Sequence, residues 1–152
     1  YDFIVVDFPD PSNYSLGKLY TTTFYQRLAA HLNPGGLLAI QSTSPLVSRQ
    51  AFWCIVETVR ATGLHVAPYH ASVPSFGEWG FIVASRAPFR VPDRFPDGLR
   101  FLTPAVARSL FEFPSDMASV PVEVNRLNNQ ILVHYHRDGW DQYARTPPLA
   151  TE

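Results

Sequence analysis

The chain has 152 residues, of which 46% are hydrophobic and 14% aromatic, and its formal net charge is −1. This length suits one globular domain, or a large part of one, with a sizeable apolar core. The near-neutral charge argues against electrostatic binding of nucleic acid, and the single cysteine, Cys54, excludes a disulfide within the chain. No stretch reaches the roughly 18 apolar residues of a membrane span, and the opening residues do not form a signal peptide.

Strands and helices alternate in the first part of the chain. Residues 3–6 are apolar and include three β-branched side chains, which predicts a strand buried on both faces. A polar loop over 11–20 leads to a helix over about 21–32, and the turn residues 33–36 end this helix. Residues 37–41 predict a second strand, so the order strand, helix, strand indicates a parallel pair with a right-handed crossover.

The next elements predict a change of strand direction. A second helix is expected over about 50–62, followed by a strand over 64–73, a loop over 74–79 and a strand over 80–85. The connection between these last two strands is short, which indicates an antiparallel pair. The sequence therefore predicts an α/β fold over 1–86, with a sheet that is mainly parallel and ends in an antiparallel strand pair.

The first strand opens the chain directly, although a central parallel strand needs neighbours on both sides. Soluble domains rarely begin in a buried strand that lacks an initiator methionine. We therefore expect residue 1 to be an internal position of a longer protein. The alternative is an edge strand in a complete small domain.

The remainder of the chain, over 87–145, predicts an irregular extension packed on the sheet. Prolines preclude a regular element over 87–98, and a short helix is expected from Thr103 to Leu110, with Pro104 in its first turn. The later parts are, in order, an irregular stretch over 112–130 with a weak strand at 120–124, a β-prone apolar segment at 131–135 and a disordered tail at 146–152.

Two carboxylates, Asp7 and Asp10, follow the first strand on a turn that Pro9 and Pro11 stiffen. Ligands of open α/β sheets bind beyond the carboxyl ends of the strands, so this pair could receive a cationic substrate. A primary amine is protonated at neutral pH, and a carboxylate in a partly desolvated site can hold the ammonium and accept its proton. The alternative is that Asp7 caps the turn and Asp10 is a solvated loop acid.

The loop between the third and fourth strands is a second candidate site. Phe76 and Trp79 could line a channel for an aliphatic cation by cation–π contact, and Glu78 could pair with a second ammonium. In the alternative, these aromatic side chains only cover the sheet edge. Gln41 and the hydroxyl side chains after it lie on the same rim as Asp7 if the two strands are parallel. They could hydrogen-bond a polar ligand or only cap the strand end.

The five histidines do not form a metal motif. His65 with His70 and His134 with His136 form two close pairs, but neither pair has a third ligand at typical spacing. The chain also lacks the glycine-rich phosphate-binding motifs and the G-x-S-x-G motif of hydrolases. The sequence therefore predicts no metal site, and it lacks the main signals of hydrolases and of nucleotide-phosphate binding.

Several segments resemble the polyamine aminopropyltransferases, the spermidine synthases. The acidic strand-end motif at 1–11 is the most specific part of this resemblance. Further similar segments lie at 19–25, 32–36, 41–42 and 74–81, whereas the segments 99–104, 113–116 and 125–127 look like the tail of the longer bacterial members. Those longer members carry membrane helices ahead of the synthase domain, and the similarity covers the chain to about residue 140.

The resemblance implies the C-terminal part of a Rossmann-like, class I methyltransferase-type sheet. It also implies transfer of an aminopropyl group from decarboxylated S-adenosylmethionine to putrescine, which gives spermidine and methylthioadenosine. Asp7 then matches the proton acceptor, and Asp7 to Asp10 match the polyamine-binding turn. Pro11, Tyr14 and Gln41 match the side of the nucleotide product. Because the sulfonium activates the carbon next to it, the resemblance implies no metal and no cofactor beyond the co-substrate.

Other expectations concern the whole protein. The family binds the adenosyl group through a glycine-rich turn and an acid on earlier strands, which this chain lacks, so the 152 residues alone are expected to be inactive. The resemblance implies a homodimer, a cytoplasmic location for this segment and a parent protein in the bacterial inner membrane. Two alternatives stay open: a methyltransferase of the same fold that uses S-adenosylmethionine, and a non-catalytic module of a membrane protein.

Overall fold

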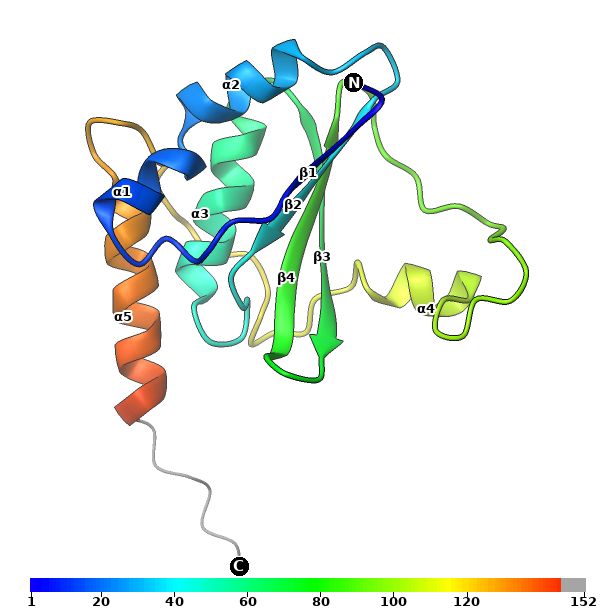
Figure 1. Cartoon of the computed structure of the whole chain (residues 1–152). Helices are drawn as coiled ribbons and strands as arrows, with labels where there is room; N and C mark the ends of the chain where they lie inside the picture. Colours follow the sequence, from blue (N-terminus) through cyan, green and yellow to red (C-terminus); the bar gives the residue numbers. More distant parts are fainter. Residues whose placement is uncertain (146–152) are drawn as a thin grey trace, which may run out of the picture.

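Four strands form one mixed sheet with helices around it (Figure 1). The computed structural model describes residues 1–145. The elements in chain order are β1 (Phe3–Val6), α1 (Tyr14–Gly17), the 3₁₀ helix η1 (Lys18–Tyr20), α2 (Thr22–Ala30), β2 (Leu37–Ser42), α3 (Arg49–Arg60), β3 (His65–Val73), β4 (Gly77–Ser85), α4 (Pro104–Ser109) and α5 (Ile131–Arg145). The predicted helices before and after β2 are thus present, as α2 and α3.

The strand order in the sheet is β1-β2-β4-β3. β1 pairs in parallel with β2, from Phe3 opposite Leu37 to Val6 opposite Ile40, whereas β4 is antiparallel to both β2 and β3. β1, β2 and β3 therefore run in one direction, and β4 alone runs in the other. This arrangement confirms the α/β fold of the Rossmann-like, methyltransferase type with an antiparallel last strand pair.

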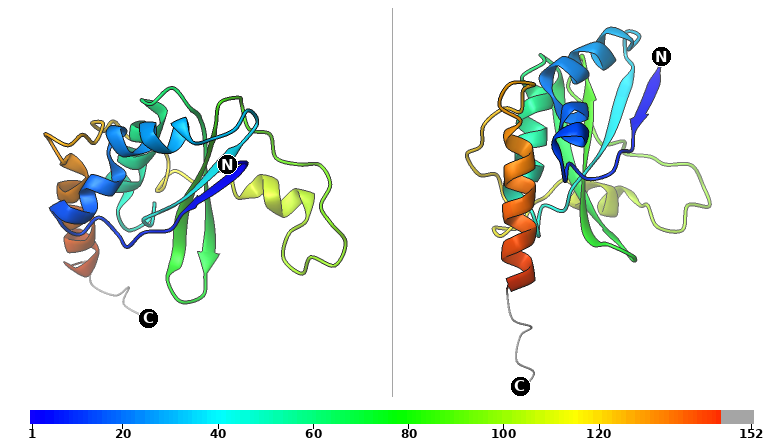
Figure 2. Two further views of the ribbon diagram at one scale, coloured as in Figure 1. Left: turned by 45° about the horizontal axis from the view of Figure 1, so that its top comes forward. Right: turned by 60° about the vertical axis from the view of Figure 1, so that its left-hand side comes forward.

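The main core lies between the sheet and the helices on one of its sides. Helices α2, α3 and α5 lie on this side, and the segment that carries α4 lies on the other (Figures 1 and 2). Leu38, Ile40 and Ile82 from the sheet and Phe52 from α3 are almost completely buried. Gly80 lets Phe52 lie directly on β4, because a Cβ at Gly80 would be 2.4 Å from the Phe52 ring.

The sequence predicted that β1 is buried on both faces, but within residues 1–145 it is buried on only one. Ile4 and Val6 face the core, whereas Phe3 is 57% and Val5 is 63% exposed. Within residues 1–145, β1 has β2 as its only strand neighbour, and no second layer covers the face that carries Phe3 and Val5. The apolar pattern correctly predicted a strand, but such a pattern does not show how many layers cover it.

The chain after β4 wraps around the outer edge of β3. The backbone amide of His70 donates to the carbonyl oxygen of Leu110 at 3.0 Å, so the extension hydrogen-bonds this edge. Phe111 then packs against Tyr69 on one face of the sheet, and Phe113 packs against α3 on the other. The extension therefore covers an edge that would otherwise expose unpaired backbone groups.

Two other predicted segments have a different local structure. No strand forms over 120–124; the Cys54 thiol of α3 instead donates to the carbonyl oxygen of Glu123 at 3.2 Å. This stretch therefore hydrogen-bonds α3 and does not join the sheet. The predicted loop over 11–20 contains α1 and η1, and the predicted tail at 146–152 lies outside the described residues.

The segment 131–135 begins the helix α5 and is not a strand, so this prediction was wrong. Leu132, Val133 and His136 are its buried residues, and their spacing places them on one face of the helix. A short apolar run does not by itself distinguish a buried strand from a buried helix. The helix start is fixed by a residue outside it: the side-chain oxygen of Asn125 accepts from the Leu132 amide at 3.3 Å.

Asn125 ties the extension to the first half of the chain. It is fully buried, and its Nδ2 donates to the carbonyl oxygens of Gly17 and Tyr20, both at 3.1 Å. Its backbone amide donates to Thr58 Oγ1 at 2.9 Å. With the bond to α5, one buried residue therefore joins α1, η1, α3 and α5.

Tyr20 is a second buried polar anchor, and it holds the turn after β1. Its hydroxyl donates to the carbonyl oxygens of Pro9 at 3.0 Å and Phe8 at 3.3 Å. Burial raises the pKa of the Tyr20 hydroxyl well above its usual range, and the nearby charges of Asp10 and Asp7 raise this pKa further. The hydroxyl therefore stays protonated at neutral pH and can keep donating to the turn.

We expect Asn125→Ala to lower the free energy of unfolding by roughly 3 kcal/mol, because it leaves buried groups on several elements unpaired. Urea unfolding followed by circular dichroism measures this change. Asn128→Ala is the matched control, since Asn128 is exposed and makes no hydrogen bond within the described residues; it should change the free energy of unfolding by less than about 0.5 kcal/mol. Equal stabilities of the two variants would contradict the role given to Asn125.

The raised pKa of Tyr20 predicts a loss of stability at alkaline pH. The unfolded chain releases the phenolic proton at a pKa of about 10, whereas the folded chain retains it, so the free energy of unfolding falls as the pH rises above this value. Tyr20→Phe should cost about 1 kcal/mol at neutral pH and then lose less stability than the wild type on going to alkaline pH. Tyr1→Phe, at a site that is 73% exposed, should retain the full alkaline loss in the same unfolding experiment.

Candidate functional site

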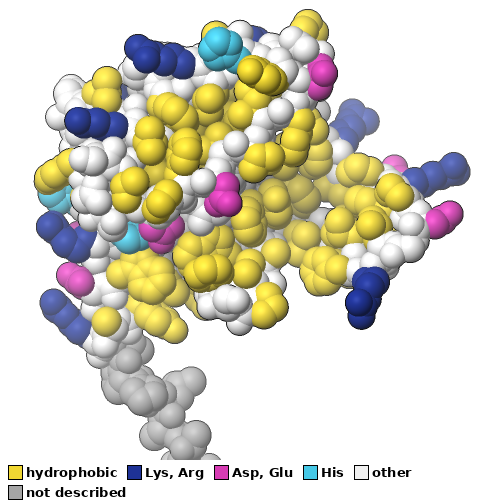
Figure 3. Space-filling model, in the orientation of Figure 1, with side chains coloured by type: hydrophobic (Ala, Val, Ile, Leu, Met, Phe, Trp, Pro, Cys, Tyr) yellow, Lys and Arg dark blue, Asp and Glu magenta, His cyan; other side chains and the backbone are white. Residues whose placement is uncertain are grey.

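A cavity of about 540 Å³ opens where β1 and β2 end, a volume in the usual range of small-ligand sites. Its lining residues come from the turn after β1, from β2 and from the β3–β4 hairpin: Asp7, Phe8, Pro9, Asp10, Gln41, Val73, Phe76, Trp79 and Phe81. The two carboxylates are the charged members of this set, and most of the others are aromatic or aliphatic. Figure 3 shows acidic side chains among hydrophobic ones on this face of the molecule. The cavity therefore suits a ligand with an aliphatic body and a cationic end.

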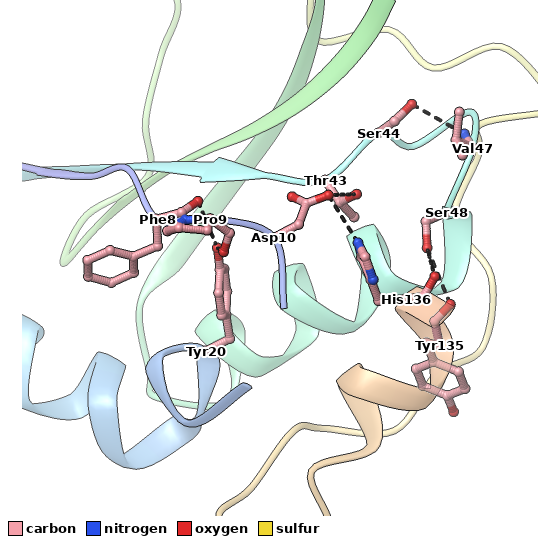
Figure 4. Close-up of polar contacts among 10 residues, drawn as sticks. All are labelled: Phe8, Pro9, Asp10, Tyr20, Thr43, Ser44, Val47, Ser48, Tyr135 and His136. Carbon is pink, nitrogen blue, oxygen red and sulfur yellow. Dashed lines mark hydrogen bonds and ion pairs between the residues drawn. The ribbon is translucent and has the colours of Figure 1, made fainter. Parts of the chain in front are cut away.

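The two acids of the turn have different environments. Asp7 is exposed and makes no hydrogen bond within residues 1–145. The Asp10 side chain is 21% exposed, and its Oδ2 accepts from Thr43 Oγ1 at 3.1 Å and from His136 Nε2 at 3.0 Å (Figure 4). The Oδ1 of Asp10 is buried and has no hydrogen-bond partner in the described part of the chain. One carboxylate is thus exposed and unpaired, and the other is hydrogen-bonded at one oxygen and unsatisfied at the second.

Gln41 connects the acidic turn to the aromatic wall of the cavity. In the amide orientation that satisfies both neighbours, its nitrogen donates to the Phe8 carbonyl oxygen at 3.0 Å. Its oxygen then accepts from the Trp79 indole nitrogen at 2.6 Å. Gln41 therefore lies on the same rim as Asp7, where the sequence placed it, and its amide fixes one turn residue and one aromatic ring.

The aromatic residues predicted at the β3–β4 connection both reach the cavity. Trp79 is 9% exposed and Phe76 is 67% exposed, and their ring centroids lie 5.3 Å apart. Phe76 belongs to the turn, whereas Trp79 lies within β4, which begins at Gly77 and not at Gly80. The pair offers a buried and an accessible aromatic surface next to the acids.

Glu78 does not line the cavity. Successive residues of a strand point to opposite faces, so Glu78 of β4 points away from the face that carries Trp79. Its carboxylate pairs with Nδ1 of His70, and Nε2 of that histidine contacts the carbonyl oxygen of Glu112 at 2.7 Å. The structure therefore places Glu78 in a link between the hairpin and the extension.

Pro11 and Tyr14, predicted on the side of the nucleotide product, do not line this cavity either. Pro11 is buried behind the turn. Tyr14 lies in the short helix α1, which Asn13 caps, and its hydroxyl lies 3.4 Å from His134 Nε2 on α5. Of the three residues assigned to the nucleotide side, the structure brings only Gln41 to the cavity.

Sequence reasoning missed two kinds of residue at this site. Val73 and Phe81 line the cavity, and the alternation of Phe81 with Trp79 along β4 could have revealed one of them. His136 contacts Asp10 from α5, whose first residues, 131–135, the sequence predicted as a β-prone segment. No local sequence pattern could have joined residues so far apart in the chain.

Residues 1–145 contain neither a metal-binding cluster nor a membrane-spanning helix. No group of three or more histidine, cysteine, aspartate or glutamate side chains is placed to hold a metal ion there. Across the same residues, none of the helices has the length and apolar character needed to cross a bilayer.

Comparison with known proteins identifies a family and several relatives of this chain. Residues 1–91 match the family model described as the spermine/spermidine synthase domain. The chain is 49% identical over 142 residues to a polyamine aminopropyltransferase of Leptospira interrogans, which covers 93% of this chain and 28% of that protein. It is 48% identical over 147 residues to polyamine aminopropyltransferase 2 of Ralstonia nicotianae, and this match covers 95% of the chain and 29% of that protein. It is 39% identical over 145 residues to a polyamine aminopropyltransferase of Mycobacterium tuberculosis, and this match covers 93% of the chain and 28% of that protein.

The similarity extends along nearly the whole chain, but the chain spans less than a third of the length of these relatives. The matched segment of the family model includes β1 to β4, the acidic turn and every residue that lines the cavity. The chain belongs to the spermine/spermidine synthase family.

Proposed function

We propose that this chain forms the amine-binding part of an aminopropyltransferase of polyamine biosynthesis. The full-length protein would transfer an aminopropyl group from decarboxylated S-adenosylmethionine to putrescine. The observation that carries this proposal is the pair of unequal carboxylates at one aromatic cavity: a free Asp7 and an Asp10 with a buried, unpartnered oxygen. The names of the similar proteins support the same reaction class.

In this proposal, Asp7 is the general base. The attacking amine must lose a proton before its nitrogen has a lone pair, and an exposed carboxylate without other partners can accept that proton. The nitrogen then forms a bond to the methylene carbon next to the sulfonium, and the carbon–sulfur bond breaks. The bonding electron pair stays on sulfur, which becomes the neutral thioether of methylthioadenosine. No covalent enzyme intermediate is required, so the protein mainly aligns the two reactants.

Asp10 is the electrostatic anchor for the cationic end of the amine. An unpartnered buried carboxylate oxygen is costly, and an ammonium hydrogen would satisfy it with a charge-assisted hydrogen bond. The aliphatic body of putrescine would lie along the aromatic wall formed by Trp79 and Phe76. Because Glu78 does not face the cavity, we propose that the second ammonium meets aromatic faces and not this carboxylate.

The other substrate needs more than this chain. The relatives are more than three times as long as the segment they share with it, and no glycine-rich nucleotide motif occurs in the sequence. We therefore propose that other parts of the full-length protein hold the adenosyl group and that the 152 residues alone do not turn over. The homodimer and the membrane-anchored parent protein stay predictions.

Asp7→Asn in the full-length protein should lower kcat by roughly 100-fold or more, as expected for the loss of a general base. Release of methylthioadenosine measures the rate, and release of S-adenosylhomocysteine from S-adenosylmethionine would indicate a methyltransferase instead. Asp97→Asn is the matched control, because Asp97 is exposed on the extension and makes no contact with the cavity. A near-normal rate in a correctly folded Asp7→Asn protein would sink the assignment of the base.

Asp10→Asn should act mainly on amine binding. The substitution keeps the shape of the side chain but removes the charge, so the KM for putrescine should rise about 10- to 100-fold. The KM for decarboxylated S-adenosylmethionine should change little, because Asp10 contacts only the amine in this proposal. Steady-state kinetics with each substrate varied in turn separates the two effects. An unchanged KM for putrescine is the result that would argue against the anchor.

A further inference from the structure

We propose that His136 is a positioning residue for the amine site. From α5, it fixes the orientation in which the Asp10 carboxylate meets the substrate ammonium. This inference rests on the proposed function, because His136 acts only through Asp10. His136 is not among the residues that line the cavity and lies behind Asp10 as seen from there.

The hydrogen bonds of Asp10 carry the first step of this inference. Thr43 and His136 both donate to the same oxygen, Oδ2, at 3.1 Å and 3.0 Å. A carboxylate is planar, so two donors from different elements at one oxygen restrict its rotation and set the direction of the other oxygen. Figure 4 shows the second oxygen of Asp10 pointing away from the His136 ring. This oxygen is the buried, unpartnered Oδ1 that we assign to the ammonium.

The chemistry of histidine suits this position. An ionised carboxylate only accepts hydrogen bonds, so Nε2 of His136 must carry a hydrogen. A neutral imidazole can donate this hydrogen bond and leave the charge of Asp10 available to a substrate cation. Lysine or arginine would hold the carboxylate equally well, but a permanent cation would compete with the ammonium for its charge.

The backbone of α5 lies close enough to the core to hold His136 in place. Ser48, just before α3, donates through its hydroxyl to the carbonyl oxygen of Tyr135 at 3.3 Å. Gly139 allows this close approach, because a Cβ there would be 2.5 Å from the Ser48 hydroxyl oxygen and 2.8 Å from its Cα. The His136 side chain is 10% exposed, and its ring lies next to that of Trp140. The imidazole is therefore held by its own helix and by the loop before α3.

Three variants of the full-length protein test this role. His136→Leu removes the donor, His136→Gln keeps an amide donor at about the distance of Nε2, and His65→Gln is the control at an exposed histidine of β3. Methylthioadenosine release is measured with putrescine and decarboxylated S-adenosylmethionine varied in turn. We expect His136→Leu to raise the KM for putrescine about tenfold, the effect of one lost hydrogen bond to a charged group. His136→Gln should recover most of this loss, and the KM for the nucleotide substrate should stay near the wild-type value in each variant.

A purely structural role for His136 gives a different pattern. Loss of packing would lower the melting temperature and kcat without separating the two KM values, and it would not favour glutamine over leucine. An unchanged KM for putrescine in His136→Leu, or equal effects of leucine and glutamine, would overturn the inference. If His136→Leu does not fold, His136→Asn takes its place, because the shorter amide does not reach Asp10 and should raise the KM for putrescine where glutamine does not.

Failure of the proposed function would be recognised separately. A wild-type protein that releases no methylthioadenosine would contradict the aminopropyl transfer before any variant is compared. Putrescine binding by isothermal titration calorimetry would then test His136 on its own. A Kd that weakens about tenfold in His136→Leu and recovers in His136→Gln supports the positioning role, and equal Kd values in wild type and His136→Leu contradict it.

Discussion

The parallel pairing of β1 with β2 is the constraint on which the position of the acidic turn depends. β1 has four residues and no other strand neighbour within residues 1–145, so its register with β2 alone fixes where the chain leaves the sheet. Asp7 consequently emerges beside Gln41, and the chain turns so that Asp10 reaches Thr43, just beyond the end of β2. A slip of one residue would move every side chain of β1 to the opposite face and would remove both acids from the cavity.

The turn itself is fixed through its backbone, and this allows its two carboxylates to differ. Pro9 restricts one backbone dihedral angle, and Tyr20 satisfies the carbonyl oxygens on both sides of the Phe8–Pro9 bond. The chain therefore does not need the acidic side chains to hold the turn, and Asp7 stays unpaired while Asp10 is held by its neighbours. Two residues of the same type thus acquire the different roles that we propose from their surroundings, and the environment was not visible in the spacing of the two acids.

The acids could be predicted from the sequence because the signal was local: an apolar strand followed at once by a proline-stiffened turn. The hairpin was harder, because the sequence placed Glu78 and Trp79 in one loop. Once β4 begins before them, their side chains must point to opposite faces, and Phe81 joins Trp79 at the cavity. His136 could not be predicted, since it lies 126 residues from Asp10 and the apolar run before it fits a strand as well as a helix.

The extension after β4 covers the edge of β3, and it also contributes a hydrogen bond to Asp10. The family model matches residues 1–91, and this part supplies the cavity, the acidic turn and Thr43. The second donor to Asp10 comes from α5, and Asn125 joins the start of α5 to η1, the helix that ends in Tyr20. The same buried network therefore holds the turn at two places: Tyr20 binds its backbone carbonyl oxygens, and His136 binds the Asp10 carboxylate. A chain that shared only the first 91 residues would retain Thr43 as a donor to Asp10 Oδ2 but would lack the second donor that restricts the rotation of this carboxylate. In the proposed amine site, the extension after β4 thus helps to orient Asp10, although none of its residues up to 145 lines the cavity.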